Sequence, residues 1–198
     1  MIVMLSGKQG SGKSSLSAEL MKLYVSPGLG FDVYQVKFAD VIYYMHDSIR
    51  KIQEAYGIPF REGCEEKDGW LLQWLGTEWG RQLHGSEIWV NATKNYVETC
   101  YRNSPKCMIV IDDCRFDNEF LAFPNALRVR LECPAIVRRS RATGWRDRED
   151  HPSETGLDEY ARQGRFDLYL DTERQSLGTC VDQIEALLKQ QTWIGKRV

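Results

Sequence analysis

The sequence contains no apolar run of membrane-spanning length, and its first residues do not follow the pattern of a signal peptide. Residues 1–5 are apolar, but this stretch is far shorter than the hydrophobic core of such a peptide. It leads directly into a glycine-rich segment. We therefore expect a cytoplasmic protein with no membrane partner.

Paired cysteine motifs are also missing. None of the six cysteines forms a C-x-x-C pair, which is the spacing that a zinc site would favour. Three of them lie in or beside apolar, strand-like segments, where thiols act as small buried hydrophobic groups: Cys107, Cys114 and Cys133. We expect the cysteines to be reduced, in keeping with the cytoplasm.

Neither sign of charge dominates the chain, whose formal net charge is −2. This balance does not favour a nucleic-acid-binding protein that is basic throughout. Positive charge is concentrated locally, and seven arginines lie between residues 128 and 148: Arg128, Arg130, Arg138, Arg139, Arg141, Arg146 and Arg148.

Short apolar runs alternate with amphipathic stretches along the 198 residues, and no linker, repeat or low-complexity tract divides them. We predict strands at 1–6, 33–38, 108–111, 126–133 and 166–170, and helices at 13–24, 40–56, 70–83, 88–103, 115–123 and 181–190. Strands that alternate with helices form parallel sheets with helices on both faces. The pattern predicts a single α/β domain over 1–198, with a polar, arginine-rich lid at 138–165.

The strongest motif follows the first predicted strand. Residues 7–14 read GKQGSGKS and match G-x-x-x-x-G-K-[S/T] between a strand and a helix, as a phosphate-binding P-loop requires. Its glycines allow successive backbone N–H groups to face phosphate oxygens, and the helix N-terminus adds a favourable dipole. The alternative is a chance Gly/Ser loop, which the strand–loop–helix context disfavours. The motif thus predicts a P-loop NTPase that binds ATP with Mg²⁺.

Two residues of this loop have expected roles in the chemistry. Lys13 would reach the β- and γ-phosphates and act in catalysis, and we expect it to be exposed when no nucleotide is bound. The hydroxyl of Ser14 would bind Mg²⁺. The predicted cofactor-binding residues are Gly10, Ser11, Gly12, Lys13, Ser14 and Ser15.

Carboxylates follow two of the predicted strands. Asp112 and Asp113 end the apolar strand at 108–111, and a carboxylate at this place lies beside the P-loop in doubly wound sheets, where it can hold Mg²⁺ through water. It can also be no more than a turn residue. Asp40 follows the second strand and could orient or deprotonate an acceptor hydroxyl. Alternatively it caps the next helix, and both roles are compatible.

The seven arginines divide into two groups. Arg128 and Arg130 alternate with the apolar residues of a predicted strand, so we expect them on a solvated face. Arg138, Arg139 and Arg141 lie on a predicted helix and are better placed to act from a lid. Arginine stabilises the charge that spreads over a transferring phosphoryl group. The alternative is a solvated surface of mixed charge.

Further short motifs recur in a fixed order along the chain. They are FAD at 38–40, LGTE at 75–78 followed by Arg81, WV at 89–90, DCRF at 113–116 with NE at 118–119, and HPSE at 151–154. Together with the P-loop, this series resembles the bacteriophage deoxynucleoside monophosphate kinases from residue 2 to about residue 188. The P-loop alone is generic, whereas the combination of the other motifs is much more specific.

The resemblance implies a nucleoside-monophosphate-kinase-like fold, ATP with Mg²⁺, and a deoxynucleotide acceptor. It implies that Arg81 and Arg115 contact the acceptor phosphate or the transferring group. It also implies that Asp113 is the strand-end carboxylate that binds the metal and that Arg138 is a catalytic lid arginine. The HPSE segment matches the family without an assigned chemistry.

Two other matching residues have simple structural interpretations. Trp89 is expected in the core, and Glu78 could serve only to hold Arg81 in place.

We conclude from the sequence that the chain is a P-loop kinase that transfers phosphate from ATP to a deoxynucleoside monophosphate, in a host cytoplasm if the protein is viral. The alternative is a phage DNA-modification kinase that phosphorylates the hydroxymethyl group of 5-hydroxymethyluracil in DNA. That enzyme needs an open basic groove, which the arginines favour and the net charge disfavours. A nucleotide-binding regulatory module without transfer activity is disfavoured by the motifs. A homodimer is compatible with the sequence.

Overall fold

The computed structural model describes residues 1–24, 32–64, 66–141, 145 and 149–194. Of these, residues 191–194 are described by their backbone alone. No helix in these ranges is long and apolar enough to cross a membrane.

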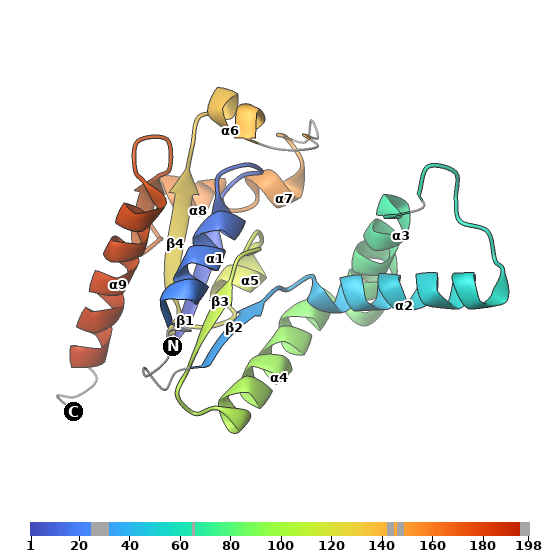
Figure 1. Ribbon diagram of the computed structural model, residues 1–198, viewed down its shortest axis with the longest axis horizontal. Coiled ribbons are helices and arrows are strands. Elements are labelled where there is room, and N and C mark those ends of the chain that lie inside the picture. Colours follow the sequence, from blue (N-terminus) through green and yellow to red (C-terminus); the bar gives the residue numbers. More distant parts are fainter. Residues whose placement is uncertain (25–31, 65, 142–144, 146–148, 195–198) are drawn as a thin grey trace.

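A parallel sheet forms the centre of the described chain (Figure 1). Its strands are β1 (Ile2–Ser6), β2 (Asp32–Val36), β3 (Cys107–Ile111), β4 (Leu127–Glu132) and β5 (Leu168–Asp171). They lie in the order β2-β3-β1-β4-β5, and all neighbouring pairs are parallel. This order brings the loops that follow β1, β2 and β3 to one edge of the sheet, where doubly wound folds bind their ligands.

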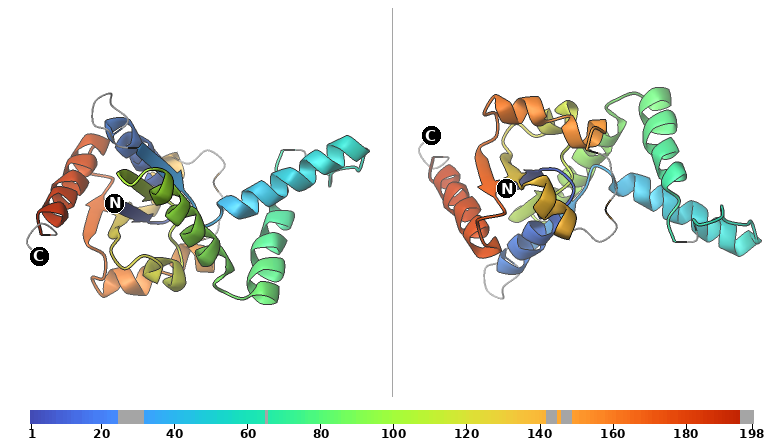
Figure 2. Two further views of the ribbon diagram at one scale, coloured as in Figure 1. Left: turned by 90° about the horizontal axis from the view of Figure 1, so that it is seen from below. Right: turned by 90° about the horizontal axis from the view of Figure 1, so that it is seen from above.

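Helices cover both faces of this sheet, as the sequence predicts (Figure 2). They are α1 (Lys13–Tyr24), α2 (Asp40–Tyr56), α3 (Gly69–Trp74), the π-helix η1 (Leu75–Leu83), α4 (Ile88–Asn103), α5 (Asp117–Leu121), α6 (Ala135–Arg141), α7 (Pro152–Thr155), α8 (Asp158–Arg162) and α9 (Leu177–Ile194). On one face α1 and α9 pack through Leu16, Leu20 and Ile184. On the other face α4 and α5 pack through Val97 and Phe120. The predicted α/β fold with two covered faces is confirmed.

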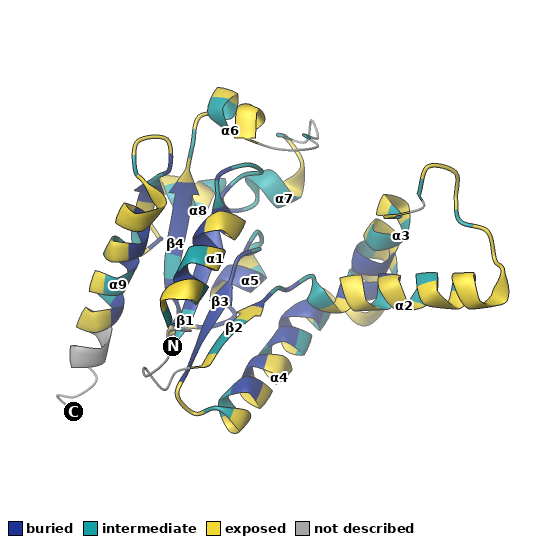
Figure 3. Cartoon of the chain, viewed as in Figure 1, coloured by how far each residue is buried: buried dark blue, intermediate teal, exposed yellow. Residues whose placement is uncertain are grey.

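Helices α2, α3 and η1 form an arm, residues 40–83, which projects from the core (Figures 1 and 2). Its base is a small apolar cluster in which Ile42, Leu75 and Trp89 are buried. Its outer half is mostly exposed, and Tyr56 is 80% exposed (Figure 3). The sequence predicts the helices of the arm but not its projection from the sheet.

The N-terminal half of the chain contains the best agreement with the predicted elements. Helices α2 and α4 have the predicted bounds of 40–56 and 88–103. Helix α2 ends at Gly57, whose φ of 65° is a left-handed conformation that glycine adopts without strain. Helix α9 begins at Leu177, four residues before the predicted start at 181.

Two further predicted helices differ from the structure. The predicted helix at 70–83 is divided into α3 and the π-helix η1, a rare form that often marks a functional site. The predicted helix at 115–123 is shortened to α5. The reason is that the carboxylate of Glu119 accepts the backbone N–H groups of Arg115 and Phe116, which fixes the start of α5.

Candidate active site

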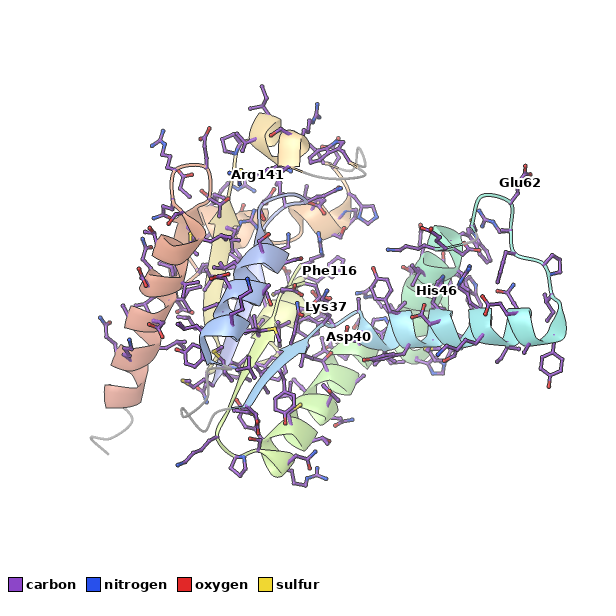
Figure 4. The ribbon with its side chains drawn as sticks, in the orientation of Figure 1. Lys37, Asp40, His46, Glu62, Phe116 and Arg141 are labelled. Carbon is purple, nitrogen blue, oxygen red and sulfur yellow. The ribbon has the colours of Figure 1, made fainter. Side chains whose placement is uncertain are left out.

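A cavity of about 1200 Å³ opens at the carboxyl edge of the sheet, between the P-loop and the arm. It is lined by most of the predicted site residues: Gly10, Gly12, Lys13, Ser14, Ser15, Asp40, Arg81, Asp113 and Arg115. Figure 4 shows Lys37, Asp40 and Phe116 where the arm joins the core, and Arg141 by α6. Segments that are far apart in sequence thus meet around one space. Two predicted residues, Ser11 and Arg138, are not in its wall.

The P-loop has the backbone that a phosphate cradle needs. Gly10 and Gly12 have φ angles of 77° and 94°, which side chains rarely allow. A Cβ at Gly10 would lie 2.6 Å from the carbonyl oxygen of Arg138, whereas the space beside Gly12 is open. Ser11 is buried, and its Oγ has no hydrogen-bond partner among the described residues. The loop therefore fits a phosphate group, with an additional hydroxyl that is free to bond.

Lys13 is buried rather than exposed, which corrects the prediction from the sequence. Only 8% of the residue is accessible, and its Nζ donates to the carbonyl oxygens of Gly7 at 2.6 Å and Lys8 at 2.9 Å. The pKa of Lys13 is lowered to about 7, chiefly by burial and in part by the nearby guanidinium of Arg115. The lysine is thus folded back against its own loop, next to the cavity.

The two strand-end carboxylates have different partners. Both oxygens of Asp113 accept backbone N–H groups, from Phe38 at 2.9 Å and from Ala39 at 3.1 Å, and this ties β3 to the start of the arm. Desolvation raises the pKa of Asp113 to about 6. Asp112 is 3% exposed, and one of its oxygens accepts from Gln35.

The other oxygen of Asp112 is an unusual group. Oδ1 is buried without a hydrogen-bond partner among the described residues, and the nearest cation, Lys37 Nζ, is 3.8 Å away. A buried carboxylate oxygen without a partner is costly unless a ligand or a water completes it. Bound Mg²⁺ usually keeps several waters and takes only one or two protein ligands. The Ser14 hydroxyl and Oδ1 of Asp112 would suffice as those ligands. Within the described ranges no three His, Cys, Asp or Glu side chains form a metal cluster.

Asp40 is the first residue of α2 and faces the cavity. Its Oδ2 accepts the backbone N–H of Lys37 at 2.7 Å, so it stabilises the turn that enters the helix, although Ala39 is the N-cap. Burial raises the pKa of Asp40, and Lys37 opposes that shift. The predicted alternative, that Asp40 caps the helix, is wrong because Ala39 occupies the cap, and the role of orienting the acceptor stays a prediction.

Arg81 enters the cavity from the π-helix. Its guanidinium lies 4.8 Å from the ring centre of Phe116, and its Nη2 is 3.6 Å from Oε1 of Glu119. The carboxylate beside Arg81 therefore belongs to Glu119 of α5, and not to Glu78 of the same motif. Burial raises the pKa of Glu119 to about 8, and Asp113 adds to the effect by repulsion.

Trp89 fixes the π-helix against α4 and is buried in the core, as predicted. Its indole N–H donates to the carbonyl oxygen of Gly76 at 2.9 Å, and Arg81 Nη1 donates to the same oxygen at 3.3 Å. A Cβ at Gly80 would overlap the Trp89 ring. The LGTE segment and the two glycines thus serve to present Arg81 to the cavity.

Arg128 and Arg130 do not form a solvated face, and that prediction is wrong. Arg130 is 6% exposed and donates to Ser6 Oγ at 3.3 Å and to Asp158 Oδ1 at 2.6 Å. Arg128 packs on the ring of Phe120 and donates to carbonyl oxygens beside it. Arg130 is buried and Arg128 is half-buried, because carbonyl and carboxylate partners compensate for the loss of water.

The described part of the predicted lid divides into two regions. Arg138 is 5% exposed and donates from Nη1 to the carbonyl oxygen of Gln9, so it packs under the P-loop. Arg141 lines the cavity. Residues 142–144 and 146–148, with Arg146 and Arg148, lie outside the described residues. Leu157 is buried in the core, so the later part of 138–165 packs on the sheet. A mobile lid stays a prediction.

Comparisons with known proteins bear on the fold. The sequence matches no protein-family model and no curated protein significantly. The structure is similar to TT1252 from Thermus thermophilus, with a TM-score of 0.56, 14% identity, and coverage of 95% of this chain and 97% of that one. It is also similar to a sugar kinase from Janibacter sp. (TM-score 0.49, 14% identity, 95% and 94% covered). A third similar structure is shikimate kinase from Aquifex aeolicus (TM-score 0.48, 13% identity, 98% and 99% covered).

At these identities the comparisons concern the fold alone, and membership of the phage kinase family stays a prediction. The chain's own features agree with them, because the P-loop follows the central strand β1 of a parallel sheet covered on both faces. The chain has a parallel α/β fold, covered by helices on both faces, with a P-loop after its central strand.

Proposed function

We propose that the protein is a kinase that uses ATP with Mg²⁺ and transfers phosphate to a free deoxynucleoside monophosphate. The observation that carries this proposal is the shared cavity of about 1200 Å³, with the P-loop on one wall and Arg81 and Arg115 on another. Its volume exceeds the roughly 300–1000 Å³ of a typical small-molecule site, so it has room for a donor and an acceptor together.

The donor side consists of the P-loop and the carboxylates at the end of β3. Backbone N–H groups of the loop would hold the phosphates. The negative charge of the phosphates would favour the charged form of Lys13. Ser14 and Asp112, with Asp113 beside them, would hold Mg²⁺. When bound, Mg²⁺ would supply positive charge to the β- and γ-phosphate oxygens. Lys13 would then turn from the carbonyl groups of its own loop to the phosphates.

The acceptor side lies at the base of the arm. Arg81 and Arg115 both line the cavity and would bind the phosphate of the acceptor, since guanidinium groups match phosphate oxygens bidentately. A monophosphate already carries a nucleophilic oxygen, so it needs orientation rather than deprotonation. Asp40 would supply part of that orientation through the turn at Lys37.

The second candidate is a kinase that phosphorylates hydroxymethyl groups in DNA, and Asp40 is the observation in its favour. A hydroxyl acceptor must lose a proton, and a carboxylate whose pKa is raised by burial, in the wall of the cavity, suits that task. Such an enzyme must also take its base out of the duplex. We favour the monophosphate because Arg130 is buried and the guanidinium of Arg128 bonds to carbonyl oxygens of its own fold, so two of the seven clustered arginines are already engaged.

A transfer assay with labelled ATP tests the proposal. It should offer each dNMP, each NMP, and duplex DNA with and without 5-hydroxymethyluracil. We expect turnover of at least one dNMP, its loss in Lys13→Ala, and normal turnover in Lys22→Ala, whose side chain on the same helix is exposed and bonds to Glu19. DNA binding that weakens steeply with salt, without dNMP turnover, would favour the second candidate. No transfer to any acceptor would exclude both.

A further inference from the structure

The HPSE segment at 151–154 has no role in the proposed function, yet its glutamate connects the two walls of the cavity. One oxygen of Glu154, Oε2, accepts the backbone N–H of Gln9 in the P-loop at 2.6 Å. The other oxygen, Oε1, accepts from Nη1 of Arg115 at 2.5 Å. The side chain of Glu154 is only 8% exposed, and both bonds are part-buried. A single carboxylate therefore bridges the donor loop and an acceptor-side arginine.

The surroundings hold Glu154 firmly in this position. His151 caps α7, because its Nδ1 accepts the backbone N–H of Ser153 at 3.2 Å. Arg115 Nη1 also donates to the carbonyl oxygen of Ser153 at 2.8 Å. The backbone of Gly156 approaches Arg115 so closely that a Cβ would lie 2.6 Å from the arginine's carbonyl oxygen. Helix α7 is thus fixed to Arg115 by both side chain and backbone.

Both partners of Glu154 line the cavity, whereas Glu154 itself does not. Its carboxylate therefore does not contact the reacting groups, and its effect on them must pass through Gln9 and Arg115. Phosphoryl transfer depends mainly on the position of donor and acceptor, and a displacement of about 1 Å can cost about a hundredfold in rate.

We propose that Glu154 is a positioning residue that fixes Arg115 relative to the P-loop at Gln9 and thereby sets the distance between the acceptor phosphate and the donor. This inference rests on the proposed kinase function. A glutamine at this position has one acceptor oxygen, and its NH₂ group would face a second donor. Because Gln9 and Arg115 face different oxygens of Glu154, the glutamine cannot accept from both in this geometry.

The kinetic test compares Glu154→Gln with Glu159→Gln, a control whose exposed carboxylate on α8 pairs with Arg162. We expect Glu154→Gln to lower kcat about a hundredfold and to change the Kd of a non-hydrolysable ATP analogue less than about threefold. Arg115→Lys should cost less kcat in the Glu154→Gln background than in the wild type, because an arginine that is no longer held by Glu154 has already lost part of its grip on the acceptor phosphate. Unchanged kcat in folded Glu154→Gln, or fully additive losses, would overturn the proposal.

A second measurement does not depend on activity, or on Glu154→Gln being folded. Arg115→Lys should shift the backbone amide proton resonance of Gln9 in the otherwise unchanged protein, because both groups bind one carboxylate. If Glu154→Gln folds, that response should be absent in its background. No shift in the single Arg115→Lys variant would overturn the connection. A shift in a protein that transfers phosphate to no acceptor would retain the connection and reject the proposed function instead.

Discussion

Replacing Lys13 by methionine should make the protein more stable at pH 6 in the absence of nucleotide, although it removes a residue that the proposed reaction requires. The lysine is 8% exposed, and burial lowers its pKa to about 7 from an ordinary value of 10.5. At pH 6 the folded protein therefore carries a buried ammonium group that would be better solvated in the unfolded chain. Methionine has a similar length and no charge.

The size of the effect follows from the two pKa values. Each pH unit between them is worth about 1.4 kcal/mol, so the buried charge costs on the order of 5 kcal/mol at pH 6. Methionine leaves the carbonyl oxygens of Gly7 and Lys8 without this donor, which costs roughly 1–3 kcal/mol. The expected net gain in the free energy of unfolding is about 2–4 kcal/mol.

The stability advantage of Lys13→Met over the wild type should shrink as the pH rises. Between pH 7 and 10.5 the unfolded chain binds more protons at Lys13 than the folded protein, so wild-type stability rises with pH across this window. The difference between the variant and the wild type should therefore shrink by about 1.4 kcal/mol per pH unit above pH 7, and should be close to zero near pH 9.

Urea denaturation from pH 6 to pH 9 measures this difference, with Lys22→Met as the control. Lys22 lies on the same helix, and its side chain is 74% exposed, so its replacement should change stability by less than about 0.5 kcal/mol at every pH. A Lys13→Met protein that is less stable than the wild type at pH 6 would refute the reasoning. A difference that does not vary with pH would refute it as well.

Three further predictions concern other residues of the cavity. Asp40→Asn should lower kcat at least about tenfold, while the Kd of an ATP analogue stays within about twofold of the wild-type value. A loss of thermal stability without a loss of kcat would show that Asp40 only stabilises the turn at Lys37. Gly80→Ala should lower stability by about 1–3 kcal/mol through overlap with the Trp89 ring, and should raise the acceptor KM by displacing Arg81; an unchanged urea midpoint would contradict this. The free energy of unfolding of Glu119→Gln should rise relative to the wild type by about 1.4 kcal/mol per pH unit from pH 4.5 to 8. The reason is that the Glu119 carboxylate is protonated in the folded wild type over this range but ionised in its unfolded chain, so the wild type loses stability as the pH rises. A difference in urea midpoints that does not vary with pH would count against this prediction.

Local patterns determined much of the fold before any tertiary contact was known. The P-loop, its strand and its helix follow from one short segment, because the glycines, the apolar run and the helical spacing are contiguous. The same holds for α2, whose apolar spacing ends at Gly57. The motif also predicted five of the residues that line the cavity: Gly10, Gly12, Lys13, Ser14 and Ser15.

Partners that are distant in sequence account for the predictions that failed. Arg130 alternates with apolar residues as a solvated arginine would, but Ser6 lies 124 residues away in sequence and Asp158 lies 28 residues away, and both bond to it inside the fold. The apolar residues at 75–83 have the spacing of an ordinary α-helix, although the segment is a π-helix. Its tertiary contact is the hydrogen bond from the indole N–H of Trp89 to the carbonyl oxygen of Gly76. No local pattern contains these contacts.

The sequence by itself determined a P-loop, an α/β sheet and a set of candidate residues, because each depends on neighbours within about one helix or strand. Only the tertiary structure decided how those residues are held. It placed Lys13 against its own loop, left one oxygen of Asp112 without a hydrogen-bond partner among the described residues, and bound Glu154 to Gln9 across 145 residues of sequence. The physical reason is that the charge state and direction of a buried polar group depend on the partners that folding brings to it, and not on its neighbours in the chain.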